Sequence, residues 1–165
     1  MIEETPSSKP ELHRVLRARA PLGFVSAAMG GLGFALPAAA GLRMALPSRP
    51  VVAVVGDGSS LYSIQSLWSA QRYRCGVLYV VLNNRGYAVM DRLAESQHAD
   101  GRGPWPAIDD VDYAALAHAF GCAAERVDAH GPLHDALAEL VPRLTDQDEP
   151  FLLEVVVEPD DVFEP

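Results

Sequence analysis

The sequence predicts an α/β protein with a doubly wound, mostly parallel sheet and helices on both faces of that sheet. Two short runs, 51–55 and 77–82, are wholly hydrophobic, as buried strands of a parallel sheet are. Each run ends in a polar turn, and the segment between them is long enough for one crossover helix. Because candidate strands and helices alternate along the chain, the two turns should lie side by side at the carboxyl edge of the sheet.

The N-terminal part of the chain is expected to hold a loop, two helices and a short strand. Residues 3–9 are polar and predict a loop, and Pro10 suits the first turn of a helix over 10–19. A strand over 24–28 then leads into a glycine-rich segment. The helix that follows, over 34–46, is predicted from its many alanine and leucine residues.

The central part is expected to be helical outside the two hydrophobic strands. After the second polar turn, residues 87–95 predict a helix, and glycine and proline residues predict a loop over 97–108. The crossover helix, over 60–73, carries hydrophobic residues near helical spacing, namely Leu61, Ile64, Leu67 and Trp68.

The C-terminal part is expected to add two helices and two strands. A helix over 112–120 ends at Gly121, and Asp109 or Asp110 is available to cap its first turn. The chain then continues with a weak strand, an amphipathic helix and a last strand, over 123–127, 132–144 and 151–157. Together these elements predict a single domain over 1–165.

Length, composition and charge exclude several classes of protein. A chain of 165 residues with 49% hydrophobic and 21% charged residues is typical of a globular domain with its own core. The net charge of −9, without a basic stripe, argues against nucleic-acid binding. The N-terminus has no signal-peptide pattern, and the longest apolar stretch, 33–46, is too short to span a bilayer. We therefore expect a cytoplasmic protein in which Cys75 and Cys122 are separate, largely buried thiols.

The chemistry of the chain is concentrated in the two polar turns, 56–59 and 83–86. Asp57 and the Asn84 amide oxygen are expected to meet at one edge of the sheet, with a backbone carbonyl near Gly86 as a third oxygen. Mg²⁺ prefers such oxygen ligands together with the phosphate oxygens of a bound molecule. The two turns therefore predict a cation that bridges the protein to a phosphate group.

The helix that follows the first turn offers a place for a diphosphate. Its first N–H groups, which carry partial positive charge, belong to Gly58, Ser59 and Ser60. A dinucleotide fingerprint is disfavoured because Leu61 stands where G-x-G-x-x-G has its third glycine, and a P-loop is excluded because no Gly-Lys-Ser/Thr occurs. The remaining alternative is that both turns are ordinary tight turns after strands, where Gly, Asn and Asp are common.

The motifs around both turns resemble the C-terminal, diphosphate-binding domain of thiamine diphosphate-dependent enzymes of the acetolactate synthase and pyruvate decarboxylase superfamily. Residues 28–39 read AMGGLGFALPAA, residues 54–59 read VVGDGS, and a pair of asparagines follows at the interval of the family signature. The YSI and LW motifs at 62–64 and 67–68 favour benzoylformate decarboxylase as the nearest relative. The resemblance covers nearly the whole chain.

The resemblance implies thiamine diphosphate and Mg²⁺ as cofactors. It assigns the cation to Asp57, the Asn84 side chain and the Gly86 carbonyl. It assigns the thiamine diphosphate to a set made up mainly of glycine and serine residues: Gly30, Gly31, Leu32, Gly56, Gly58, Ser59, Ser60 and Tyr87.

Two further roles follow from the resemblance. The Gly30 carbonyl would accept a hydrogen bond from the aminopyrimidine, and Leu32 would support the bent shape of the cofactor. Val89 and Met90 would face a 2-oxo acid substrate. From their positions alone, Leu32, Val89 and Met90 could equally be core residues.

The chain is expected to hold only part of an active site. In the family, a glutamate that activates the pyrimidine ring comes from a separate pyrimidine-binding domain, and this chain has room neither for that domain nor for a middle domain. Glu3, Glu4 and Glu11 precede the predicted fold without a strand-end context, so no catalytic residue is assigned to this chain. His130 and His134 lack further ligands for a zinc site.

We therefore expect either one subunit of a split enzyme or a separated C-terminal domain, without decarboxylase activity of its own. An apolar face around Leu32 and Met90 should associate with a pyrimidine-binding partner or with a second copy, which gives a hetero- or homo-oligomer. The leading function is the cofactor-binding portion of a 2-oxo acid decarboxylase. The alternatives are an acetolactate synthase-like carboligase subunit and a catalytically silent scaffold subunit of the same fold.

Overall fold

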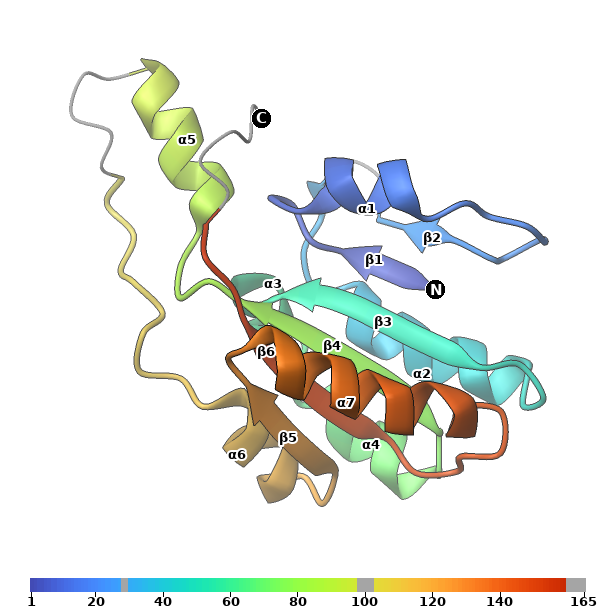
Figure 1. Ribbon diagram of the computed structural model, residues 1–165. Helices are drawn as coiled ribbons and strands as arrows, with labels where there is room; N and C mark the ends of the chain where they lie inside the picture. Colours follow the sequence, from blue (N-terminus) through green and yellow to red (C-terminus); the bar gives the residue numbers. More distant parts are fainter. Residues whose placement is uncertain (28–29, 98–102, 160–165) are drawn as a thin grey trace.

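The computed structural model describes residues 1–27, 30–97 and 103–159 and contains a six-stranded sheet in which all pairs are parallel (Figure 1). The strands are β1 (Ile2–Glu4), β2 (Val25–Ser26), β3 (Val51–Gly56), β4 (Val77–Asn83), β5 (Ala123–Val127) and β6 (Phe151–Val156). Their order across the sheet is β2-β1-β3-β4-β6-β5, so the predicted doubly wound α/β fold is confirmed.

The strands are connected mainly by helices. The helices are α1 (Lys9–Val15), α2 (Ala35–Ala45), α3 (Asp57–Leu61), α4 (Ser66–Arg72), α5 (Ala88–Gln97), α6 (Tyr113–Ala119), α7 (His130–Leu140) and the 3₁₀ helix η2 (Val141–Arg143). Within the described ranges, none of them combines the length and the apolar character that a membrane crossing requires.

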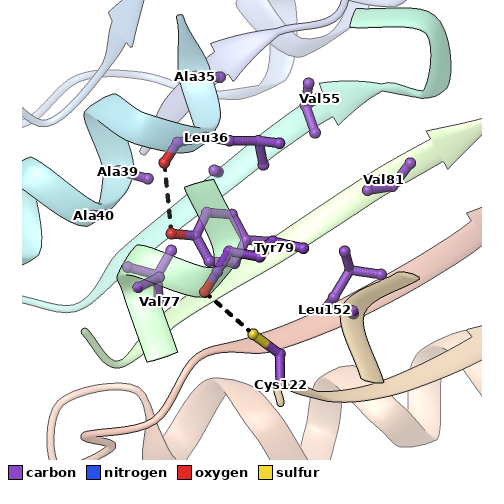
Figure 2. Packing of buried hydrophobic residues seen from close by; sticks show 14 of the residues in the cluster. Ala35, Leu36, Ala39, Ala40, Val55, Val77, Tyr79, Val81, Cys122 and Leu152 are labelled. Carbon is purple, nitrogen blue, oxygen red and sulfur yellow. Dashed lines mark hydrogen bonds between the residues drawn. The ribbon is translucent and has the colours of Figure 1, made fainter. Parts of the chain in front are cut away.

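Helices cover both faces of the sheet (Figure 1). The side chains of β4 alternate between the two layers. Val77, Tyr79 and Val81 belong to a core shared with α2, α4 and α6, and Figure 2 shows Tyr79 at its centre. Leu78 belongs to a second core, which packs against α7. Because successive side chains point to opposite faces, a strand buried on both sides must be hydrophobic throughout.

The register of β3 and β4 brings the two polar turns together. Val55 lies opposite Val81, and Gly56 lies opposite Leu82 in the parallel pair. Both strands therefore end at the same edge of the sheet, and the adjacency predicted for the two turns is confirmed.

Both cysteines are buried free thiols, as predicted. The Cys122 thiol donates to the Leu67 carbonyl at 3.5 Å in the core (Figure 2). Burial raises the pKa of Cys122 to about 11, so this thiol stays protonated and unreactive at neutral pH.

The loop predicted over 3–9 is wrong at its start, because residues 2–4 form β1. Ile2 lies opposite Val25 of β2 on one side and opposite Ala53 of β3 on the other. A strand of this length shows no periodic pattern in a sequence. It exists because the sheet supplies hydrogen-bonding partners on both of its sides.

Three boundaries in the first and middle parts also differ from prediction. The helix expected over 10–19 ends at Val15, because α1 buries none of its residues and packing does not extend it. The strand expected over 24–28 is shorter than predicted, because Phe24 and Ala27 lie outside β2, and Ala28 lies outside the described residues. The loop expected over 97–108 lies partly outside them as well, and Gln97 ends α5.

The crossover between β3 and β4 is two short helices rather than one. Backbone hydrogen bonds from Ser63 to Ser60 and from Ser66 to Ser63 turn the chain between α3 and α4.

The cap of α6 also differs from prediction. The Asp112 carboxylate, rather than that of Asp109 or Asp110, accepts the Ala115 N–H at 2.7 Å.

Candidate functional site

A cavity of about 310 Å³ opens at the carboxyl edge of β3 and β4. Most of the residues predicted for the site line it, namely Gly30, Leu32, Gly56, Asp57, Gly58, Ser59, Asn84, Gly86, Tyr87, Val89 and Met90. Two predicted residues lie elsewhere. Gly31 lines neighbouring cavities, and Ser60 is fully buried, with its Oγ donating to the Asp57 carbonyl at 2.7 Å.

Asp57 and Asn84 converge on a single backbone N–H. Asp57 is the first residue of α3 and is 3% exposed, and its Oδ2 accepts the Gly86 N–H at 3.2 Å. The Asn84 Oδ1 accepts the same N–H at 3.1 Å. Arg85 has a φ of 65°, a left-handed conformation that reverses the chain between Asn84 and Gly86. The two side chains predicted to share a cation therefore point to the same place.

The Asp57 carboxylate suits a cation electrostatically. Burial raises its pKa, while the N–H groups of Gly58, at 2.8 Å, and Gly86 act in the opposite direction. A divalent cation beside this carboxylate would favour its ionised form. The described residues contain no group of three or more His, Cys, Asp or Glu side chains that could hold a metal. A cation here would be bound by the Asp57 carboxylate, the Asn84 amide oxygen and the Gly86 carbonyl, together with oxygens of a bound molecule. These are hard oxygen donors, which fit Mg²⁺.

The beginning of α3 forms another part of the cavity wall. Gly56, its N-cap residue, is extended, with φ −70° and ψ 152°, and has no side chain with which to cap the first turn. Both Gly58 and Ser59 line the cavity beside it. Backbone N–H groups at an uncapped helix start are suitable donors to a phosphate group.

Sequence reasoning did not assign eight of the residues that line this cavity, and four of them are consecutive: Thr5, Pro6, Ser7 and Ser8. They follow β1 directly. A Cβ built on Gly56 would lie 3.9 Å from the Pro6 Cδ, so this segment lies close to the end of β3. The hydroxyl residues of this segment could be seen in the sequence. Their place at the edge of the sheet could not be predicted, because the sequence analysis did not predict β1.

Glu4 holds the glycine-rich segment at the start of α2. It ends β1, is 4% exposed, and its two carboxylate oxygens accept the N–H groups of Gly33, Phe34 and Ala35 at 2.6, 2.7 and 2.6 Å. An anion is favoured at this position by the helix dipole. The expectation that Glu4 precedes the fold without a strand-end context is therefore wrong, and its carboxylate is occupied by backbone donors.

Tyr87 lies so close to Gly58 that a side chain at position 58 would overlap it. We expect Gly58→Ala to lower the free energy of unfolding by about 1–3 kcal/mol, because overpacking a filled site displaces its neighbours. The added Cβ would lie 2.6 Å from Tyr87 Cε1 and 3.2 Å from Ile108 Cδ1. Urea denaturation followed by circular dichroism measures this change.

The matched control for this variant is Gly41→Ala. Gly41 is exposed within α2, and a Cβ there meets no atom within 4 Å. This substitution should raise the free energy of unfolding by about 0.5–1 kcal/mol, because alanine restricts the unfolded chain and favours the helix. Equal effects of the two substitutions would show that Tyr87 and Ile108 do not restrict Gly58.

The chain is similar to thiamine diphosphate-dependent enzymes. It matches the family model described as "Thiamine pyrophosphate enzyme, C-terminal TPP binding domain" over residues 7–155. A benzoylformate decarboxylase of Pseudomonas aeruginosa is 33% identical over 158 residues, which are 93% of this chain and 28% of that protein. A protein of Mycobacterium tuberculosis, described as an acetolactate synthase large subunit, is 34% identical over 117 residues, 64% of this chain and 22% of that protein.

A solved structure shows the same fold. The crystal structure of benzoylformate decarboxylase from Polynucleobacter necessarius is 30% identical and has a TM-score of 0.86, over 99% of this chain and 30% of that one. This chain thus spans less than a third of the length of these relatives. The family match, the parallel sheet and the cavity at its carboxyl edge agree, and the chain belongs to the family of C-terminal, thiamine diphosphate-binding domains of the thiamine pyrophosphate enzymes.

Proposed function

We propose that this chain supplies the thiamine diphosphate- and Mg²⁺-binding portion of a 2-oxo acid decarboxylase resembling benzoylformate decarboxylase. The observation that carries the proposal is the convergence of Asp57 and Asn84 on the Gly86 N–H, all three residues lining the cavity. The likeness to benzoylformate decarboxylases in sequence and in structure supports the reaction class.

In this proposal the chain binds and orients the cofactor. Asp57, the Asn84 amide oxygen and the Gly86 carbonyl hold the cation, and this oxygen set leaves positions for phosphate oxygens. The start of α3 would hold the diphosphate, with Gly56, Gly58 and Tyr87 beside it and the Ser59 N–H as a donor, while the Gly58 N–H donates to the Asp57 Oδ1 at 2.8 Å. When bound, thiamine diphosphate supplies the electron sink for decarboxylation of a 2-oxo acid.

The remaining lining residues orient the organic part of the cofactor and the substrate. Gly30 has a φ of 66°, which favours glycine, and its carbonyl would meet the aminopyrimidine. Leu32 is half-buried at the cavity and would support the bent cofactor from below. Val89 and Met90, at the start of α5, would meet the substrate.

Catalysis would require a partner that carries a pyrimidine-binding domain. The chain spans 28% of the Pseudomonas relative, and the Glu4 carboxylate at this edge is occupied by three backbone donors. Helix α5, which extends beyond the sheet in Figure 1, buries none of its residues and leaves Met90 and Leu93 40% and 39% exposed. This apolar surface beside the cavity supports association with such a domain or with a second copy.

Calorimetry tests the proposal. Titration of thiamine diphosphate into the protein should release heat in the presence of Mg²⁺ and give none in the presence of EDTA, because the cation bridges the protein and the diphosphate. Thiamine without the diphosphate is the matched control and should give no heat. Absence of heat under all conditions would favour the silent scaffold, and turnover of a 2-oxo acid by this chain alone would contradict the need for a partner.

The second candidate is an acetolactate synthase-like carboligase subunit. The 34% identity to a chain described as an acetolactate synthase large subunit favours it. Product analysis with pyruvate and with benzoylformate, after a pyrimidine-binding partner is supplied, separates the two functions. Acetolactate from pyruvate would identify the carboligase, and benzaldehyde from benzoylformate would identify the decarboxylase.

A further inference from the structure

A fully buried glutamate, Glu154 of β6, lies behind the turn between β4 and α5 and does not line the cavity. Its Oε1 accepts the Asn83 Nδ2–H at 2.7 Å, and its Oε2 accepts the Ala114 N–H at 3.1 Å. The Arg126 Nε lies 3.8 Å from Oε1. A buried carboxylate needs such partners. The shortest of these contacts is the one with Asn83, which belongs to the turn that carries the candidate site.

Asn83 connects Glu154 to the turn. It is 2% exposed, and its Oδ1 accepts the Arg85 N–H at 3.0 Å. Because its Nδ2 donates to Glu154, the amide is oriented with its oxygen toward Arg85. Arg85 has the left-handed φ of 65°, and the next N–H, that of Gly86, is the one on which both predicted cation ligands converge.

We propose that Glu154 is a positioning residue for the cation site: acting through Asn83, it holds the 83–86 turn in the conformation that brings Asn84 toward Asp57. The identity of the cation rests on the proposed function, whereas the coupling of Glu154 to the turn rests on the hydrogen bonds alone. Outer-shell partners that orient metal ligands commonly change metal affinity when they are replaced. The two competing roles for Glu154 are an effect of its charge on the cation and a purely structural contribution to the fold.

Two substitutions at Glu154 separate positioning from charge. Glu154→Gln removes the charge and leaves one acceptor oxygen for two donors, Asn83 and Ala114, so the charge-assisted hydrogen bond to Asn83 is weakened or lost. Glu154→Asp keeps the charge but shortens the side chain, so that it no longer reaches Asn83. Positioning predicts that both variants weaken Mg²⁺ binding, measured calorimetrically with thiamine diphosphate present, by about 10-fold or more. A charge effect predicts that the aspartate variant binds like the wild type.

Asn83→Ala tests the connection itself. It should weaken Mg²⁺ binding as much as Glu154→Gln, and the double substitution should be little worse than either alone, because both act through one path. Full additivity of the two losses would overturn the proposal. If Glu154→Gln does not fold, the Asn83→Ala variant still decides the question.

Hydrogen exchange provides a readout that needs no ligand. In the ligand-free protein, the amides of Arg85 and Gly86 should exchange about 10-fold faster in Glu154→Gln and Asn83→Ala, because the turn loses the charge-assisted hydrogen bond between Glu154 and Asn83 that holds it. If the wild type binds no Mg²⁺, the proposed function fails, while these exchange rates still decide whether Glu154 holds the turn. Unchanged exchange together with unchanged affinity would overturn the inference.

Two control variants separate positioning from general loss of stability. Val155→Ala truncates the next residue of β6, whose side chain belongs to the core against α7, and so destabilises the protein while leaving the side-chain hydrogen bonds of Asn83 in place. Arg126→Gln removes the 3.8 Å ion pair of Glu154 and leaves its hydrogen bond to Asn83 in place. Both should retain the exchange rates of the turn and the Mg²⁺ affinity. A loss in either variant equal to that in Glu154→Gln would assign the effect to stability or to the ion pair.

Discussion

Asp57→Asn is expected to weaken the binding of Mg²⁺ with thiamine diphosphate by more than about 100-fold. Replacement of outer-shell partners of a metal ligand costs about 10–100-fold, so loss of the charged ligand itself should cost more. The substitution keeps the size of the side chain and removes its charge. Because burial already raises the pKa of this carboxyl, loss of the charge itself costs little stability. The new NH₂ group would face one of the two backbone donors, Gly58 or Gly86, so we expect the free energy of unfolding to fall by about 1–3 kcal/mol.

Calorimetry on the wild type and the variant measures the effect, and urea denaturation confirms that the variant is folded. The matched control is Asp128→Asn, which makes the same chemical change at an exposed position that does not line the cavity. This control should bind Mg²⁺ and thiamine diphosphate like the wild type. Wild-type binding by Asp57→Asn would remove the basis of the proposed cation site.

Glu4→Gln is expected to lower the free energy of unfolding by about 2–4 kcal/mol, and the melting temperature by about 6–12 °C. The carboxylate accepts the N–H groups of Gly33, Phe34 and Ala35. A glutamine has one acceptor oxygen, and its NH₂ group would face a backbone donor. At least one buried N–H would then lack an acceptor, and the start of α2 would lose its negative charge.

Thermal and urea denaturation measure this effect, with Glu11→Gln as the matched control. Glu11 is exposed on α1 and pairs with Arg14 at the surface, so its loss should change the stability by less than about 0.5 kcal/mol. Equal stabilities of the two variants would show that the contacts of Glu4 do not stabilise the start of α2. A selective loss at Glu4 would identify this residue as the anchor of the glycine-rich segment that carries Gly30 and Leu32.

Much of the sheet could be predicted because a strand buried on both faces has a distinctive sequence. The segments that form β3 and β4 are hydrophobic at successive positions, because helices cover both faces of the sheet and bury the side chains on each face. Their adjacency followed from the length of the connection between them and from the preference for simple crossovers. The convergence of Asp57 and Asn84 could be expected on the same grounds.

The N-terminal elements could not be predicted because they have no local signal. β1 consists of Ile2–Glu4, and two of its residues are acidic, yet its side chains are 1–4% exposed. The sequence therefore reads as a polar loop. Pairing with β2 and β3 makes it a strand and brings Thr5 to Ser8 to the cavity.

The sequence by itself determined the fold class, the family motifs and the two turns on which the proposed cofactor site depends, because these features lie in contiguous segments with local patterns. Only the tertiary structure decided what surrounds the turns. Glu154 meets Asn83 across 71 positions of sequence, and Glu4 meets the start of α2 across 29 to 31. Such partners leave no periodic trace in the chain, because a buried carboxylate is stabilised by whichever donors the fold brings to it.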